Sequence, residues 1–458
     1  MSPTDASVAQ SGAKAIPLAP ETASGATLGP GYRRYALLLL LGIYILNFLD
    51  RQVINILAEP IKQDLGLADW QIGLMSGLAF ALFYTVLGVP IARVAETRSR
   101  PAVIAAALTI WSGFTALCGV AQNFVQLCLF RIGVGVGEAG CTPPAHSLIT
   151  DYVPKSRRAS ALAFYSMGVP LGSLLGMAMG GVVADAYGWR VAFLVAGLPG
   201  LAFAVIAWLT LKETRSRVRE DVAAARAAQP SFAEAMRLLA RKRTFWLLAL
   251  AAAIKSFISY GQAPFVASFF LRNHPDQITG LAAGFDLKSV GFLGLALGLI
   301  SGLCGAFSSI AGGWIADRTS ARNVRDCLIA PALAVLVSVP VFILALLTPD
   351  ARLALAILVV PYALNYFWYG PVYGTTQGIV PPNMRATAAA ILLFVINLIG
   401  LGLGPLAVGL LSDYVANGLD LGPGAGIRWA LIIASLFGVL SAGLFWAARK
   451  TIAQEMES

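Results

Sequence analysis

Charged residues are scarce in this sequence, and their scarcity limits what kind of protein it can be. Of its 458 residues only 12% are Asp, Glu, Lys or Arg, while 58% are hydrophobic. Soluble domains carry roughly 25% charged residues, so a soluble globular protein is excluded for most of the chain. The formal net charge of +10 does not indicate nucleic-acid binding, because the basic residues gather in the tails and in alternate short segments between apolar runs.

Residues that build metal centres and disulfide frameworks are also few. The chain has two histidines and five cysteines. The cysteines lie in or beside apolar runs, where they are expected to pack as small hydrophobic side chains. The sequence shows no Ser–His–Asp arrangement, metal cluster or soluble catalytic domain. We therefore expect neither an enzyme nor a bound metal or organic cofactor.

Long apolar runs are what the sequence has in abundance. About 20 mostly apolar residues suffice to cross the hydrocarbon core of a bilayer as a helix, and twelve such segments recur along the chain. They predict an all-α polytopic membrane protein. The expected spans are residues 34–58, 70–91, 102–121, 124–150, 159–185, 189–211, 244–271, 288–315, 327–348, 352–379, 386–412 and 428–448.

Two tails and one polar segment divide the chain. Residues 1–33, rich in Ala, Ser, Thr, Pro and Gly, are expected to be a disordered N-terminal tail, and 449–458 a short C-terminal tail. The basic linker 212–243 separates a six-helix bundle over 34–211 from a second bundle over 244–448. Because Lys and Arg favour the cytoplasmic side, we expect both tails and the linker in the cytoplasm, with the protein in the plasma (inner) membrane.

The linker carries a helical pattern of its own. Phe232, Met236 and Leu239 follow the i, i+4, i+7 spacing of one helical face. An apolar face on a basic segment is typical of a helix that lies at the membrane surface.

The two bundles share repeated motifs. Three motifs of the first bundle return in the second, in the same order and at nearly the same separation. They are GVPIAR at 88–93 as GWIADR at 313–318, VP at 153–154 with RASA at 158–161 as VP at 380–381 with RATA at 385–388, and GVVAD at 181–185 as GLLSD at 409–413. An internal repeat of this kind indicates two matched units, so we predict two six-helix halves in a parallel pseudo-twofold arrangement.

The motif Gly313-x-x-x-Asp317-Arg318 resembles the signature loop of the major facilitator superfamily. The first copy departs from that pattern, since Ala92 stands where an aspartate is expected, although Arg93 is kept. Within that superfamily the first half resembles the Spinster lipid transporters. The residues that carry this resemblance are NFLDR at 47–51, Arg131-x-Gly-x-Gly-x-Gly-Glu138-Ala139, PP at 143–144, ITDY at 149–152 and GVPLG at 168–172.

The stretch RIGVGVGEAG at 131–140 also contains G-x-G-x-x-G, a pattern found in dinucleotide-binding loops. Here it lies inside an apolar span without a surrounding βαβ unit, and a phosphate-binding loop cannot sit within a continuous membrane helix. Its glycines are better explained as positions where a second helix approaches closely.

Arg131 and Glu138 lie seven residues apart and therefore share one helical face. A charge at the bilayer centre costs about 2.5–3.5 kcal/mol on insertion scales, so both side chains need a partner or a wet cavity. Asp50 in the first span has a compatible depth to pair with Arg131, with Glu138 deeper towards the cytoplasm. Two interpretations follow: a static network that joins the first and fourth spans, or a titrating network that couples transport to protons while Arg131 can hold a phosphate or carboxylate. The resemblance to Spinster proteins implies the second role for these three residues.

Further polar residues within the spans are candidates for lining a cavity. Arg51, which we also assign to proton coupling or substrate binding, points about 100° away from Asp50 on the helix and faces either an outer vestibule or lipid head groups. Lys255, midway along the seventh span, faces the cavity or pairs inside the second half. In the tenth span four tyrosines share one face and predict either an aromatic cavity wall or interfacial packing. These tyrosines are Tyr362, Tyr366, Tyr369 and Tyr373, with Asn365 and Asn397 as additional cavity candidates.

Charged residues at the ends of spans predict a gate. Arg93, Asp317 and Arg318 belong to the repeated loops, and Asp151 and Arg158 are expected to serve the same latch. Such side chains pair in one conformation and separate in the other, which gives the two-state element that alternating access requires.

The resemblance implies a secondary transporter for an amphipathic, anionic lipid such as a lysophospholipid or sphingoid phosphate, coupled to protons as the only expected cofactor. One alternative is the same machine carrying a small organic anion or a drug. Another is a membrane sensor that carries nothing. We expect a monomer embedded in the membrane, without a nucleic-acid partner.

Overall fold

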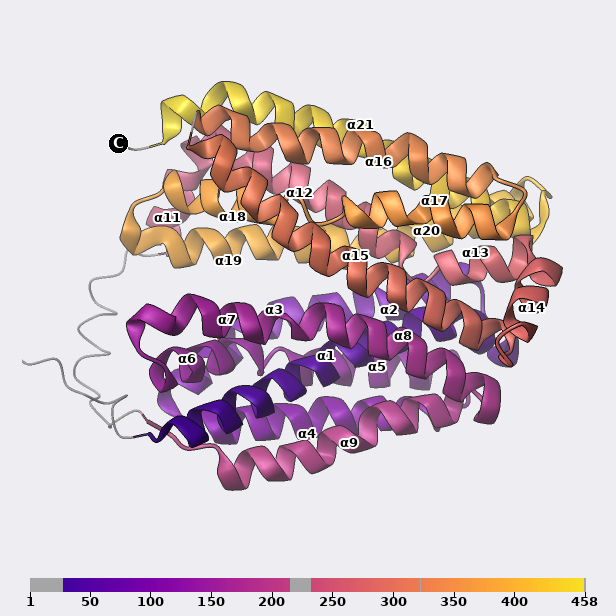
Figure 1. The fold of residues 1–458 in the computed structure, drawn as a ribbon, viewed down its shortest axis with the longest axis horizontal. Coiled ribbons are helices and arrows are strands. Elements are labelled where there is room, and N and C mark those ends of the chain that lie inside the picture. Colours follow the sequence, from indigo (N-terminus) through magenta and orange to yellow (C-terminus); the bar gives the residue numbers. More distant parts are fainter. Residues whose placement is uncertain (1–27, 215–231, 322, 457–458) are drawn as a thin grey trace, which may run out of the picture.

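The computed structural model describes residues 28–214, 232–321 and 323–456, and in this part of the chain the regular structure is helical. The helices form two bundles that lie side by side along their length (Figure 1). The first bundle contains α1 (Pro30–Leu65), α2 (Asp69–Ser76), α3 (Leu78–Thr97), α4 (Arg100–Cys118), α5 (Phe124–Glu138), α6 (Thr142–Tyr152), α7 (Arg158–Ser166), α8 (Gly168–Tyr187) and α9 (Trp189–Thr210).

The second bundle begins with α11 (Phe232–Arg241). It continues with α12 (Arg243–Gln262), α13 (Val266–Asn273), α14 (Pro275–Ala283), α15 (Ser289–Ser320), α16 (Ile329–Leu347), α17 (Ala351–Ala363), α18 (Tyr369–Gly378), α19 (Arg385–Val395), a π-helical segment η4 (Ile396–Leu403), α20 (Gly404–Asp413), a second π-helical segment η5 (Tyr414–Gly418) and α21 (Gly422–Glu455). The predicted class, an all-α membrane protein of two six-helix halves, is confirmed.

Eleven helices in the described residues are long and apolar enough to cross a membrane. The tenth predicted span is the exception, because its helix is broken at 364–368, so that the apolar α17 covers only Ala351–Ala363 and α18 continues it. Large apolar side chains remain exposed on the outer helices, for example Leu209 at 68% and Ile310 at 75%. Such exposure suits a surface that faces lipid rather than water.

Several predicted spans are interrupted where the sequence weakens the helix. The fourth span breaks at 139–141 before Pro143 and Pro144, and the seventh breaks between α12 and α13 at Pro264. Proline lacks the backbone N–H that a continuous helix needs and clashes with the preceding turn. The predicted span 244–271 is therefore divided into α12, which ends at Gln262, and the short α13, which begins at Val266.

The ends of the chain differ from the predicted tails. The first helix begins at Pro30 rather than at 34, since proline is well suited to the first helical turn, and the last helix continues to Glu455 rather than 448. Glu455 accepts hydrogen bonds from the backbone N–H groups of Arg243 (2.9 Å) and Thr244 (3.1 Å), so the predicted tail caps the start of α12. Residues 1–27 of the predicted disordered tail lie outside the described residues.

The linker helix is present as α11, whereas 215–231 lie outside the described residues. Its Leu239 is almost completely buried against the second bundle, and the Leu239 carbonyl accepts a hydrogen bond from Trp246 Nε1 at 3.1 Å. This part of the predicted amphipathic face therefore packs on protein.

The two halves are in contact at the end of the molecule far from both termini. Here α8 lies along α15 and α2 along α20, while the ribbons of the halves diverge towards the end where the termini lie (Figure 1). The approach of α8 and α15 requires glycine, since a Cβ on Gly181 would lie 2.5 Å from the Val290 carbonyl oxygen.

Candidate functional site

An ion pair between α1 and α5 lies at the centre of the first half. Arg51 Nε donates to Glu138 Oε2 at 2.6 Å, and the Glu138 side chain is fully buried while that of Arg51 is 15% exposed. The guanidinium also lies over the rings of Phe48 (5.1 Å to the centroid), Phe80 (4.9 Å) and Tyr84 (4.7 Å). The expectation that Arg51 faces an outer vestibule or lipid head groups is therefore wrong. Aromatic faces and a carboxylate together compensate the charge.

Asp50 has a neutral partner. It is 1% exposed, and its Oδ2 accepts a hydrogen bond from Thr115 Oγ1 on α4 at 3.1 Å. Its other oxygen, Oδ1, has no hydrogen-bond partner among the described residues. The sequence did not single out Thr115, which reaches the site only through the packing of α4.

Arg131 lies close to these groups without an ion pair. It is 1% exposed, and its Nε and Nη1 have no hydrogen-bond partner among the described residues. Its guanidinium lies over the Phe80 ring, 5.3 Å from the centroid. The expected Asp50–Arg131 pair is thus not formed in this structure, because Thr115 binds the carboxylate and Phe80 covers the guanidinium.

Close helix packing brings the Phe80 ring next to both arginines. A Cβ on Gly135 would lie 2.6 Å from the Phe80 carbonyl oxygen, so α3 and α5 touch through their backbones at this point. The glycines of RIGVGVGEAG therefore act in helix packing, as the sequence predicted, and the segment ends at the break after α5.

The second half contains a buried cation of its own. Lys255 on α12 is 5% exposed, and its Nζ donates to Asn365 Oδ1 (2.6 Å) and to Ser259 Oγ (3.0 Å). Asn365 lies in the break between α17 and α18, where the backbone is not α-helical. The lysine is thus held inside the second half, by neutral groups.

A central cavity lies between the halves. Lined by residues of both, it occupies about 820 Å³ including space open to solvent. Its lining includes Gln52, Ser173 and Met177 from the first half. From the second half it includes Ser256, Ser259, Tyr260, Gln262, Ala263, Ser301, Tyr362, Asn365, Tyr366, Trp368 and Tyr369.

The aromatic face of the tenth span contributes to this cavity in part. Tyr366 and Tyr369 have ring centroids 5.3 Å apart and both line the cavity. Tyr373 stacks on Tyr369, with centroids 5.9 Å apart, and is not among the lining residues. Asn397, in η4, is also outside this lining.

The residues predicted to form a latch lie at the end near the termini and make their contacts within their own halves. Asp151 accepts a hydrogen bond from Arg100 Nη1 at 2.6 Å, and Arg158 Nε donates to the Thr150 carbonyl at 2.9 Å. Arg93, Asp317 and Arg318 are exposed, and Arg318 lies over the Trp314 ring at 5.3 Å.

Arg100 is a structural residue that the sequence analysis missed. It is 1% exposed and bonds to Asp151, Ser147 and Glu213, so it joins α4 to α6 and to the segment after α9. Its signal in the sequence was a basic residue at the start of an apolar run.

Replacing Arg100 by Met is expected to lower the thermal stability of the purified protein by several degrees. Removing one partner of a fully buried ion pair costs about 3–5 kcal/mol, and the cost here is smaller because Asp151 and Glu213 are 40% and 27% exposed. The matched control is Arg449→Met, whose pair with Asp326 is 22% and 35% exposed on its two sides. Because the Arg449 guanidinium is partly exposed whereas that of Arg100 is 1% exposed, its loss should cost less, towards the roughly 0–1 kcal/mol of a surface pair. Equal shifts in the two variants would contradict the structural role of Arg100.

A second polar cluster that the sequence missed joins the two halves at the end far from the termini. Arg272, at the end of α13, donates from Nη2 to Glu59 Oε2 (2.6 Å) and to Asp69 Oδ1 (2.8 Å), and from Nη1 to Asp69 Oδ2 (2.8 Å). Lys62 and Ser412 also bond to Asp69, each at 2.6 Å. Burial opposes the charged guanidinium, but its bonds to Asp69 and Glu59 leave the pKa of Arg272 raised, so it stays charged.

Two aspartates of the repeated GVVAD and GLLSD motifs strengthen this junction. Asp413 accepts hydrogen bonds from the backbone N–H groups of Asp69 (3.0 Å) and Trp70 (2.8 Å), at the start of α2. Asp185 accepts one from the Gly291 N–H (2.5 Å), at the start of α15. Each half therefore caps a helix of the other, which satisfies free N–H groups and places a negative charge at the positive end of a helix.

Comparisons with known proteins identify the family and the fold of the chain. A sequence model described as the Major Facilitator Superfamily matches residues 40–405. A solved structure of a bacterial homolog of the human lysosomal transporter Spinster, in an inward-facing and unoccupied conformation, is 32% identical, covers 94% of this chain and 100% of its own, and has a TM-score of 0.82. An MFS-type efflux pump of Mycolicibacterium smegmatis is 34% identical over 404 residues, 88% of this chain and 89% of the pump. An Arabidopsis thaliana protein named "Probable sphingolipid transporter spinster homolog 2" is 27% identical over 371 residues, 78% of this chain and 73% of that protein.

Proposed function

The chain belongs to the major facilitator superfamily of secondary transporters, and we propose that it moves an amphipathic lipid with an anionic group by alternating access coupled to protons. It is an integral multi-pass membrane protein and, as the sequence predicted, not an enzyme. The lipid cargo, of lysophospholipid or sphingoid-phosphate type, rests on the similarity to Spinster transporters. Proton coupling rests on the geometry of the first half.

The observation that carries the proposal is the unequal pairing of four ionisable side chains, three of them buried and Arg51 15% exposed. Arg51 and Glu138 form an ion pair, whereas Asp50 and Arg131 lie near it without a charged partner. A static network is expected to pair all of its charges, since an unpaired buried charge is costly. The unpaired members favour a network that changes its protonation and its partners during transport.

Asp50 is the proton carrier in this proposal. One of its oxygens is held by Thr115, and the other is free to take up a proton. When Asp50 is protonated it is neutral and needs no cation. When Asp50 releases the proton, the positive charge of the nearby Arg131 compensates the charge of the carboxylate. The first half can therefore hold Asp50 in either protonation state.

The contacts between the halves fit one end of an alternating-access cycle. The Arg272 cluster and the two aspartate caps join the halves at the end far from the termini, while the ribbons of the halves diverge at the other end (Figure 1). With both termini in the cytoplasm, as the distribution of basic residues predicts, this is an inward-facing state. Arg93, Asp317, Arg318, Asp151 and Arg158 are then the candidates for closing the cytoplasmic end in the opposite state.

A second candidate function is the same carrier acting on a drug or a small organic anion. The similarity to an MFS-type efflux pump favours it. The aromatic and hydroxyl groups of the central cavity suit either cargo. In both cases we propose a monomer that works in the plasma (inner) membrane, with no nucleic-acid partner and no cofactor other than protons.

The test is flux of a radiolabelled lysophospholipid through the purified protein in proteoliposomes, with and without a pH gradient. We expect accelerated flux over protein-free liposomes and a further rise, or a reversal of direction, when the gradient is imposed. Lipid flux that does not depend on the pH gradient would contradict proton coupling. Absence of lipid flux together with gradient-driven flux of a small organic anion or a dye would establish the second candidate in its place.

A further inference from the structure

Lys255 is a buried cation whose bonding partners are all neutral. Its ammonium donates to Asn365 Oδ1 at 2.6 Å and to Ser259 Oγ at 3.0 Å, and the residue is 5% exposed. No Asp or Glu of the described residues forms an ion pair with it. An ammonium carries three N–H donors, so one donor remains for another group.

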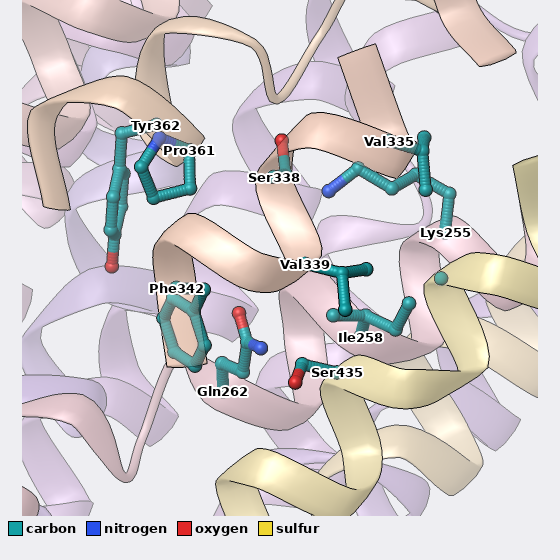
Figure 2. A pocket seen from close by; sticks show the side chains of 11 residues that line it. Lys255, Ile258, Gln262, Val335, Ser338, Val339, Phe342, Pro361, Tyr362 and Ser435 are labelled. Atoms are coloured by element: carbon teal, nitrogen blue, oxygen red, sulfur yellow. The ribbon is translucent and has the colours of Figure 1, made fainter. Parts of the chain in front are cut away.

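A pocket opens beside this ammonium, between α12, α16, α17 and α21. It encloses about 400 Å³ including space open to solvent. Among the eleven described residues that line it, Lys255 is the only charged one (Figure 2). Figure 2 shows the lysine extending its ammonium towards Ser338 on α16.

The pocket adjoins the central cavity between the halves. Gln262 and Tyr362 line both spaces, and the two partners of Lys255, Ser259 and Asn365, line the central cavity. A molecule in the central cavity therefore lies one side chain away from the ammonium. The amide of Gln262 and the hydroxyl of Tyr362 have no hydrogen-bond partner of their own among the described residues, so both can donate to a guest.

Most of the other lining side chains are apolar. Ile258, Val335, Val339 and Phe342 surround the pocket, and the hydroxyl groups of Ser338 and Ser435 already donate to backbone carbonyls at 2.6 Å. Apolar walls lower the local dielectric and make a charge–charge interaction stronger than in water. An uncompensated ammonium in such a pocket favours an oxyanion as its occupant.

We propose that this pocket is the binding site for the anionic group of the cargo, a carboxylate or a phosphate, with Lys255 as the charged anchor and Gln262 and Tyr362 as additional donors. The inference rests on the proposed function in one respect, the amphipathic nature of the cargo. It divides the two tasks between the halves: the first half carries the proton and the second half holds the anion. Arg131, the anchor expected from the sequence, is 1% exposed and does not line the central cavity.

The experiment compares three single-chain lipids with the same acyl chain: a lysophosphatidate, a fatty acid and a monoacylglycerol. Their affinities for the full-length protein in detergent are measured by isothermal titration calorimetry. For the wild type we expect at least one anionic lipid to bind about tenfold or more tightly than the neutral one, as a charged hydrogen bond predicts. Which of the two anionic lipids binds more tightly identifies the anion as phosphate or carboxylate.

Two variants remove the anchor in different ways. Lys255→Met is expected to reduce the affinity for the anionic lipid to that of the monoacylglycerol, whose own affinity stays unchanged. Asn365→Asp keeps the lysine and places a fixed carboxylate at the position 2.6 Å from Nζ, so it should lower the anionic affinity to the same extent. If Lys255→Met does not fold, Asn365→Asp alone tests whether Lys255 binds the anionic group. The control is Lys450→Met, an exposed lysine near the C-terminus, which should bind all three lipids as the wild type does.

Two results would overturn the inference: a wild type that does not distinguish charged from neutral lipids, or a full preference for the anionic lipid in both variants. In the second case the cargo is still a lipid and its anion binds elsewhere. The proposed lipid cargo fails independently if the wild type binds none of the three lipids. Benzoate and phenyl phosphate then serve as probes, and binding that is lost in Lys255→Met would support the anion pocket in a carrier of small anions.

Discussion

Asp50→Asn is expected to reduce proton-driven net transport to the level of protein-free liposomes, while the protein still inserts and folds. Asparagine has nearly the same shape, and its amide oxygen can accept the hydrogen bond that Thr115 donates to Asp50 at 3.1 Å. It cannot take up or release a proton. The measurement is uptake of the labelled cargo driven by a pH gradient in proteoliposomes. Exchange of labelled for unlabelled cargo across the membrane should persist, because exchange needs no net proton movement.

The matched control for Asp50→Asn is Thr115→Val. Valine removes the hydroxyl and keeps the volume close to that of threonine, so the carboxyl group remains but loses its one hydrogen bond. We expect transport to continue with a shifted dependence on pH. Gradient-driven uptake at the wild-type rate by Asp50→Asn would contradict the proposal. The buried charges would then be a static network that joins α1, α4 and α5.

Arg131→Ala and Glu138→Gln test the rest of the network, and each is expected to abolish net transport. The two variants differ in their effect on the fold. Arg131 forms no ion pair among the described residues, so its loss breaks none, whereas Glu138→Gln leaves Arg51 without its counter-charge in a largely buried site. Thermal stability should therefore fall more in Glu138→Gln than in Arg131→Ala.

The spans and the two halves could be predicted from the sequence because both depend on local patterns. A run of apolar residues is sufficient to place a membrane helix, and a repeated motif is sufficient to relate two halves. The helix breaks were also encoded locally, by Pro143, Pro144 and Pro264. Their consequence was not foreseen, since the sequence does not say how far a helix turns after a break.

The partners of the buried charges could not be predicted, although all four charged residues were. Asp50 and Arg51 differ by one helical position, and the choice of which one meets Glu138 depends on where α3 and α4 place Phe80 and Thr115. Those positions follow from glycine-mediated contacts between helices that are distant in the sequence, such as the contact of Gly135 with the Phe80 carbonyl. A pattern within one helix contains no information about a third helix.

The Arg272 cluster at the end far from the termini could not be predicted for a similar reason. Glu59, Asp69 and Arg272 lie near the ends of spans, where charged residues are common and usually face water. They meet because α13, which begins after the break at Pro264, lies against α1 and places Arg272 next to Glu59. The repeated motif did contain a signal, since Asp185 and Asp413 occupy equivalent positions and both cap a helix of the opposite half.

Arg272→Ala is expected to break the Arg272 cluster. The protein should then shift towards the conformation in which the two halves are apart at the end far from the termini. The side chains involved are nearly buried: Arg272 is 9% exposed, Glu59 7% and Asp69 1%. Removing one partner of a buried ion pair costs about 3–5 kcal/mol. That cost falls only on the closed state, because water solvates the two acids once the halves separate. A difference of this size changes a two-state ratio by roughly two to three and a half orders of magnitude.

The shift can be measured as a distance between spin labels at Gln122 and Asn417, two exposed positions at this end of the first and second halves. The five native cysteines are first replaced by alanine or serine. Pulsed electron–electron double resonance should report mainly the short distance between the labels in the protein without native cysteines. In Arg272→Ala it should report a larger share of a longer distance. The control is Arg190→Ala, which breaks an ion pair with Asp64 at the same end but within one half, and it should leave the distances unchanged.

The aspartate caps should act in the same direction and with a smaller effect. Loss of a helix cap by substitution with alanine costs about 0.5–2 kcal/mol, so Asp185→Ala and Asp413→Ala are each expected to move the population less than Arg272→Ala does. Because each aspartate caps a helix of the other half, the double variant should approach the sum of the two single effects, as expected for sites that share no partner. A distance distribution that stays short in Arg272→Ala and in the double variant would mean that apolar packing of α8 with α15 and of α2 with α20 closes this end by itself.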